Sequence, residues 1–119
     1  MKNLTTTIKQ FDIWVADLNP RIGTESGKVR PVLIVQTDLL NNRHPSTIIC
    51  PITTNIYRES EILRVHIKKG AGGVSADCSI MIDQVRSIDN IRLKKKIGTL
   101  PLLLTELVKE NLKVILDLD

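Results

Sequence analysis

The side chains most able to do chemistry by themselves, the cysteines and histidines, are few in this sequence. Among 119 residues there are two cysteines and two histidines. The context of Cys50 and Cys78 is typical of reduced thiols packed as small hydrophobic groups, not of a secreted disulfide framework. Together with His44 and His66 they form no CxxC or HxxxH spacing of the kind that holds zinc. The sequence therefore predicts no metal site.

Two glycine-containing segments have the composition of phosphate-binding loops but lack the pattern. In Gly23 to Lys28 (GTESGK) the glycine spacing is one residue shorter than in a P-loop, and Val29 stands where a serine or threonine is needed. A proline-led strand follows where a P-loop requires a helix. Gly70 to Gly73 (GAGG) lacks the GxGxxG spacing. We expect neither segment to bind a nucleotide cofactor, and we expect no other cofactor.

The elements that must position the polar residues are mostly short strands. Apolar alternation and β-branched runs predict strands at 11–18, 32–36, 47–53, 62–67, 78–85 and 92–99, with a glycine turn at 68–73 making one hairpin. Asn19 to Val29 has turn chemistry and is expected to be a loop. Because Pro31 favours an extended conformation at the residue before it, Arg30 is expected at the junction of this loop and the next strand.

One helix is expected at the end of the sheet, starting near Pro101 and running to about Leu116. Apolar residues at near-helical spacing predict that one face of this helix packs on the sheet: Leu100, Leu104, Leu107, Leu112 and Ile115. Seven or so short strands with an appended helix favour a small, strongly bent antiparallel barrel or two-sheet structure over a doubly wound α/β fold.

Composition limits the class of protein further. A chain of 119 residues has the size of one domain, and no apolar run approaches the ~20 residues that span a bilayer. The first ten residues do not have the pattern of a signal peptide, so we expect a cytoplasmic protein. The net charge of +4 favours contact with phosphates, whereas 3% aromatic residues argue against a base-stacking platform.

Several motifs occur in an order that resembles the MazF/PemK family of toxin endoribonucleases. The resemblance covers nearly the whole chain from Phe11 to Leu116, and it rests on these segments: Asp12 to Pro20 (DIWVADLNP), Gly23 to Glu25 (GTE), Val29 to Val35 (VRPVLIV), Pro51 to Thr54 (PITT) and Asp83 to Asp89 (DQVRSID).

This resemblance implies a mainly β fold, an SH3-like antiparallel barrel (CcdB/MazF-like) with a C-terminal helix. It also implies a homodimer that cleaves single-stranded RNA at short sequences without a metal ion, leaving 2′,3′-cyclic phosphate and 5′-hydroxyl ends. The partner would be a cognate antitoxin protein. Residues 1–119 would form one toxin domain, with 1–10 as an N-terminal extension.

The resemblance also assigns catalytic residues. It implies that Arg30, from the R-P-V motif, stabilises the charge that develops on the phosphate, and that the Thr53 hydroxyl positions the phosphate. A guanidinium suits the first task because its planar fork contacts two phosphate oxygens at once and stays charged. An ordinary surface arginine and a structural strand threonine are the alternatives.

Further residues are expected to contact RNA. Glu25, on a loop, is a proton acceptor, a base contact, a partner of Arg30 or a solvated carboxylate; Gln84 reads a base edge or makes structural hydrogen bonds. The full set of expected substrate-binding residues is Glu25, Lys28, Thr54, Asp83, Gln84 and Arg86. The run from Arg92 to Lys96 either follows the RNA backbone or is a solvated face.

The sequence departs from some PemK-type members at two positions. Those members carry a histidine where this chain has Thr24 and an arginine where it has Met81, which favours the Arg30/Thr53 mechanism over one in which Asp83 is the catalytic base. The same departures motivate an alternative, a catalytically silent RNA-binding module of the same fold. A gyrase poison of the CcdB type is disfavoured, because the Trp-Gly-Ile ending of those toxins is absent.

Overall fold

The computed structural model describes residues 7–20, 22–25, 27–55 and 63–119, and these form seven strands and one α-helix. The strands are β1 (Asp12–Asp17), β2 (Val29–Ile34), β3 (Ser46–Thr53), β4 (Arg64–Ile67), β5 (Cys78–Met81), β6 (Arg86–Asp89) and β7 (Leu93–Thr99), and the helix is α1 (Leu102–Leu116). The predicted start of the fourth strand at Ile62, and residues 1–6 of the expected N-terminal extension, lie outside the described residues.

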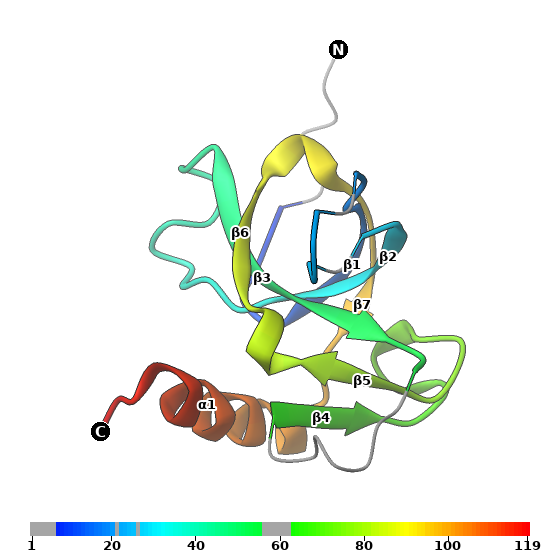
Figure 1. Ribbon diagram of the computed structural model, residues 1–119, viewed down its shortest axis with the longest axis vertical. Coiled ribbons are helices and arrows are strands. Elements are labelled where there is room, and N and C mark those ends of the chain that lie inside the picture. The colour runs from blue at the N-terminus through cyan, green and yellow to red at the C-terminus, as the bar shows by residue number, and fades with distance from the viewer. Residues whose placement is uncertain (1–6, 21, 26, 56–62) are drawn as a thin grey trace.

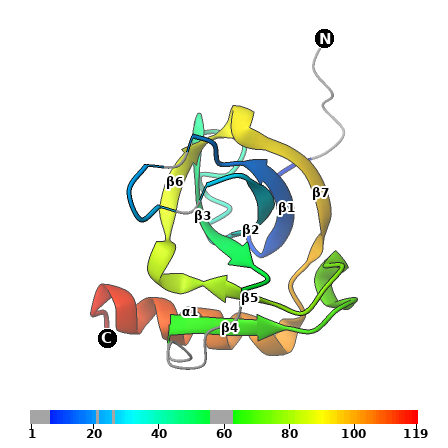
Figure 2. The same ribbon diagram turned by 45° about the vertical axis from the view of Figure 1, so that its right-hand side comes forward.

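The strands form one strongly bent antiparallel sheet. Its order is β4-β5-β3-β2-β1-β7, and β6 pairs with β3 away from this path. The sheet curls into a barrel-like shape without closing, and α1 runs alongside β4 and β5 (Figures 1 and 2). The predicted antiparallel barrel with a C-terminal helix is therefore confirmed as a barrel-like, open sheet.

Each face of the sheet contributes to its own apolar cluster. Ile13, Ile52 and Ile80 belong to the cluster that also contains Val108 of α1. Trp14 belongs to the second cluster, where it is 8% exposed and its indole N–H donates to Asp12 (3.3 Å). Trp14 is thus a core residue.

The prediction of one strand over 78–85 is wrong. β5 ends at Met81, a single 3₁₀ turn covers Ile82–Gln84, and β6 follows. The reason lies in β3, whose C-terminal end pairs with β5 while its N-terminal half pairs with β6. The turn carries the chain from one half of β3 to the other, and no glycine or proline marks it.

Two smaller expectations also need correction. β2 begins at Val29, so Arg30 and Pro31 lie within the strand and not at its junction with the loop. Pro31 is tolerated there opposite Val15, although a proline cannot donate to the ladder. In α1, which otherwise matches the expected helix, Leu107 is 47% exposed, and Val108 is the residue that packs into the core.

Candidate functional site

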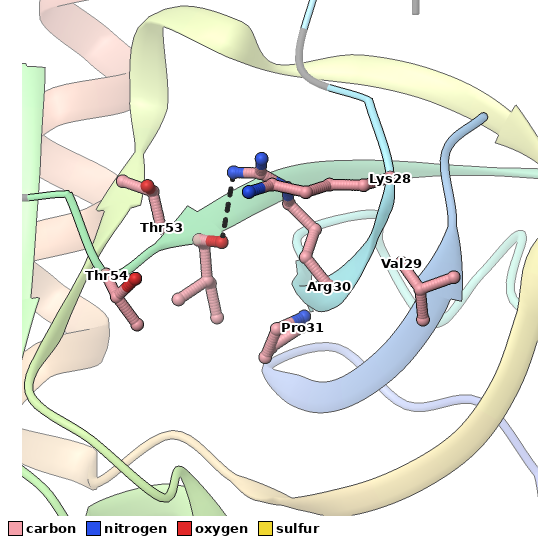
Figure 3. Close-up of a pocket in the computed structure, with 7 residues that line it drawn as sticks. Lys28, Val29, Arg30, Pro31, Thr53 and Thr54 are labelled. Carbon is pink, nitrogen blue, oxygen red and sulfur yellow. Dashed lines mark hydrogen bonds between the residues drawn. The ribbon is translucent and has the colours of Figure 1, made fainter. Parts of the chain in front are cut away.

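A pocket of about 190 Å³ opens between the start of β2 and the end of β3. It is lined by Lys28, Val29, Arg30, Pro31, Ile52, Thr53 and Thr54. Figure 3 shows the Arg30 and Lys28 side chains extending toward the end of β3, where Thr53 and Thr54 lie. The structure therefore brings four of the expected site residues together.

Strand register explains why Arg30 and Thr53 meet. Val32 of β2 is paired with Pro51 of β3, and the two strands are antiparallel. The pairing ends there, and two residues beyond it on each strand lie Arg30 and Thr53, which both line the pocket. The R-P-V and P-I-T-T segments thus lie side by side because their strands pair.

The Arg30 guanidinium is held by backbone carbonyl groups. Its Nε donates to the carbonyl oxygen of Gly27 (3.0 Å) and its Nη1 to that of Ile52 (3.5 Å), the latter drawn in Figure 3. Arg30 is half-buried. A guanidinium has five N–H donors, so these two bonds are compatible with a contact to phosphate oxygens. The bonds fix the plane of the fork in advance.

Thr53 is half-buried and Thr54 is exposed. The Thr53 Oγ1 accepts a hydrogen bond from the backbone N–H of Asn55 (3.0 Å). Because the hydroxyl accepts in this bond, its own hydrogen can be donated to a phosphate oxygen.

The loop between β1 and β2 is pinned at its base next to the pocket. The Lys28 N–H donates to the Asn19 side chain (2.8 Å), and the Leu18 N–H donates to the Lys28 carbonyl oxygen (3.0 Å). Glu25 is exposed on this loop and is not among the residues that line the pocket. The Gln84 amide donates to the Thr24 carbonyl oxygen (3.4 Å), which joins the 3₁₀ turn to the loop.

Asp83 lies against an arginine that the sequence analysis did not single out. The Arg64 Nε is 4.0 Å from the Asp83 carboxylate, and the Arg64 side chain is only 10% exposed. The alternation that puts Val65 in the core places Arg64 on the opposite face, and that signal could have identified Arg64.

Burial, with a smaller contribution from the charge of Asp83, raises the pKa of Cys50 to about 12.

The remaining basic candidates lie outside the pocket. Arg86 is half-buried at the start of β6, opposite Ile49. Lys94, Lys95 and Lys96 are on the edge strand β7, where Lys96 pairs with Asp12 (3.2 Å) and Lys94 donates to the Ile91 carbonyl oxygen (3.1 Å). These groups can act on a polyanion only by long-range electrostatic attraction, or by contacting a part of it that extends over the surface beyond the pocket.

The pocket is thus suited to an anion. It combines a fixed guanidinium, a lysine and two hydroxyl groups, the donors that recognise phosphate oxygens. Within the described ranges, no three His, Cys, Asp or Glu residues come together to form a metal site. None of the helices in the described part of the chain is long and apolar enough to cross a membrane.

Fold and pocket define a small barrel-like β protein with a cationic site where two strands meet. Over residues 9–116 the chain matches the family described as PemK-like, MazF-like toxin of type II toxin-antitoxin system, and it belongs to that family. It is 37% identical over 111 residues to endoribonuclease EndoA of Bacillus subtilis (strain 168), covering 93% of this chain and 96% of that protein. The family expected from the sequence is confirmed.

Solved structures agree on the fold. MazF from Deinococcus radiodurans superposes with a TM-score of 0.80 at 22% identity, covering 95% of this chain and 99% of that one. A mycobacterial endoribonuclease in complex with its cognate antitoxin superposes with a TM-score of 0.74 at 14% identity, covering 94% and 95%. At these identities the likeness shows the shared fold.

Proposed function

We propose that this chain is the toxin of a toxin-antitoxin module and a sequence-specific endoribonuclease that cleaves single-stranded RNA without a metal ion. The observation that carries the proposal is the pocket that the anchored Arg30 guanidinium and Thr53 both line. Support comes from the family and from the name of the B. subtilis relative, an endoribonuclease.

The proposed reaction is an intramolecular transesterification. The 2′-oxygen attacks the adjacent phosphorus and gives up its proton, the bond from phosphorus to the 5′-oxygen breaks, and that oxygen takes up a proton. The products are a 2′,3′-cyclic phosphate and a 5′-hydroxyl end. Charge accumulates on the phosphate oxygens between these steps, so donors fixed in advance around them lower the barrier most.

In this scheme Arg30 stabilises the charged phosphate and Thr53 donates a hydrogen bond that positions it. Lys28 and Thr54, which also line the pocket, bind the RNA backbone. Glu25, Gln84, Asp83 and Arg86 contact RNA around the pocket. Glu25 and Asp83 are the carboxylates that compete for the role of proton acceptor at the 2′-hydroxyl.

We further propose that the toxin acts as a homodimer and that a cognate antitoxin inhibits it. The family description names a toxin-antitoxin system, and one solved structure of the same fold is an endoribonuclease bound to its cognate antitoxin. A polyanionic antitoxin segment lying in the pocket would compete directly with RNA for Arg30 and Lys28.

The decisive experiment is cleavage of a long mixed-sequence RNA in EDTA, with the new ends mapped by primer extension. Wild type should cut at one short motif and leave 5′-hydroxyl ends that a polynucleotide kinase labels directly. Arg30→Ala and Thr53→Val should each lower the rate on the order of a hundredfold to a thousandfold.

Two controls match these variants. Arg43→Ala removes an exposed arginine and Thr99→Val an exposed threonine, both outside the pocket, and both proteins should cleave at the wild-type rate. RNA that stays intact yet binds wild type would favour the alternative, a silent RNA-binding module. Equal cleavage by Arg30→Ala and wild type would contradict the proposed role of the pocket.

A further inference from the structure

A row of polar residues crosses the sheet from the pocket to the edge strand β4. Thr53 of β3 is paired directly with Ser79 of β5, and Ser79 is paired directly with His66 of β4. Directly opposite residues of antiparallel strands point to the same face of the sheet. The three side chains therefore form a row that starts at the pocket, which Thr53 and Arg30 both line.

This row lies on the face of the sheet that α1 does not cover. The neighbouring residues on the same three strands, Ile52, Ile80 and Val65, belong to the apolar cluster that also contains Val108 of α1. Because side chains alternate along a strand, Thr53, Ser79 and His66 point the other way. Figure 1 shows β3, β5 and β4 side by side with α1 along one side of them.

The accessibility of the row changes along its length. Thr53 is half-buried, Ser79 is fully buried and His66 is exposed. Within the described part of the chain, the Ser79 hydroxyl has no hydrogen-bond partner. Because the Ser79 hydroxyl is covered, Thr53 and His66 are the members of the row that a bound ligand can reach.

We propose that bound RNA leaves the pocket along this face of the sheet, from Thr53 toward β4, and that His66 binds a backbone phosphate beyond the one that is cleaved. This proposal rests on the proposed function and adds a phosphate subsite to it. An imidazole ring donates an N–H bond to a phosphate oxygen whether it is neutral or protonated. With adjacent strands about 5 Å apart, Thr53 and His66 are separated by ~10 Å of backbone, room for one to two nucleotides of an extended strand.

The test measures binding and cleavage separately. Short single-stranded RNAs containing the mapped cut site are titrated with wild type, His66→Ala and His66→Lys in a filter-binding assay, and kcat and KM are measured on the same RNAs. His66→Ala should raise Kd and KM about threefold to tenfold, with kcat changed less than twofold, since a contact away from the reacting atoms adds binding alone. His66→Lys should restore most of the affinity.

The second histidine provides the matched control. His44 is exposed on the segment before β3, where its ring lies 3.1 Å from the Ser46 hydroxyl. His44→Ala should bind and cleave like wild type.

Uncharged methylphosphonate linkages locate the phosphate that His66 contacts. In a set of RNAs, each with one methylphosphonate in place of a phosphate, the replacement at a single position outside the cut site should weaken RNA binding by wild type and leave RNA binding by His66→Ala unchanged. Identical profiles for the two proteins would overturn the subsite, as would unchanged binding by His66→Ala. If wild type binds RNA without cleaving it, the proposed catalysis fails, and the same titrations on short fragments of the bound RNA decide the role of His66; if it binds no RNA, both proposals fail.

Discussion

At the scale of single residues, the geometry of Arg30 matters more than its charge. Its guanidinium is oriented by the carbonyl oxygens of Gly27 and Ile52 before any substrate binds. A lysine ammonium is a compact charge on a flexible stem, without a planar fork. It cannot reproduce both backbone bonds and a two-oxygen contact to phosphate.

We therefore predict that Arg30→Lys lowers kcat by about a hundredfold, close to the loss in Arg30→Ala, because one donor aimed at developing charge is worth that much. Single-turnover cleavage of the mapped RNA measures it. Arg43→Lys, at an exposed position, should leave the rate unchanged. A fall of less than threefold in Arg30→Lys would mean that charge alone is sufficient.

The two cysteines should be unreactive in the folded protein. Burial raises the pKa of Cys50 from 9.0 to about 12, and burial with the nearby charge of Asp77 raises that of Cys78 from 9.0 to about 11. At pH 8 the reactive thiolate is then only roughly 1 in 10,000 for Cys50 and 1 in 1,000 for Cys78.

Alkylation by iodoacetamide at pH 8 should accordingly be at least about a hundredfold slower in the native protein than in urea, with Cys78 labelled before Cys50. Because both native pKa values lie above 9.0, the native rate should keep rising with pH beyond 9, where that of the unfolded thiols levels off. Mass spectrometry of timed samples identifies the labelled residue. Equal rates in the native and unfolded protein would contradict the burial of these thiols.

At the scale of elements, the 3₁₀ turn Ala71–Gly73 packs against β7 through glycine on both sides. A Cβ atom at Gly98 would lie 2.1 Å from the Gly72 carbonyl oxygen, and one at Gly73 would lie 2.0 Å from that of Ile97. These neighbours are backbone atoms, which cannot rotate away as a flexible side chain can. The turn and β7 therefore approach most closely at positions that carry no side chain.

We predict that Gly98→Ala lowers the free energy of unfolding by about 3 kcal/mol or removes the cooperative transition, since overpacking against fixed atoms is costly. Urea denaturation followed by circular dichroism measures it.

Gly23→Ala is the comparison variant. Gly23 has φ +58°, and no described residue lies within 4 Å of the added Cβ, so that change should cost only about 1 kcal/mol, the cost of a left-handed conformation. Equal losses of unfolding free energy in Gly98→Ala and Gly23→Ala would show that the backbone around Gly98 shifts to relieve the clash.

The same scale shows what local sequence patterns can predict. β1, β7, α1 and the β4–β5 hairpin follow from alternation, glycine turns and helical spacing, which act between near neighbours in the chain. The break between β5 and β6 does not, because it is imposed by β3, which needs a different partner for each half. Leu107 and Val108 differ by one position on the helix, and only the packing of α1 against the sheet selects Val108.

The candidate site also has one part that the sequence could predict and one part that it could not. Arg30 and Thr53 could be named from the resemblance, whereas their meeting depends on the pairing of β2 with β3. The link between Arg64 and Asp83 joins β4 to the turn after β5, and that link could not be inferred without the register. Contacts between strands thus carry the information that a single sequence, taken segment by segment, lacks.

At the scale of the whole molecule, the net charge of +4 attracts RNA from any direction, but only some cations lie at the pocket. Lys28 lines the pocket, whereas Lys113 pairs with Glu110 (3.5 Å) on α1. The helix covers the face of the sheet that is opposite Arg30 and Thr53. Lys28→Glu and Lys113→Glu each change the net charge by the same two units, from +4 to +2.

We predict that Lys28→Glu lowers kcat/KM for RNA about tenfold or more at low salt, and that Lys113→Glu lowers it less than about threefold, because screened charges act mainly within a Debye length of ~10 Å at 0.1 M salt. Raising the salt should bring the two variants together, since released counterions then contribute less to binding. Initial rates at several salt concentrations measure both effects. Equal losses at low salt would mean that the overall charge, and not the cations of the pocket, controls RNA capture, and the pocket would then act only after RNA has been bound.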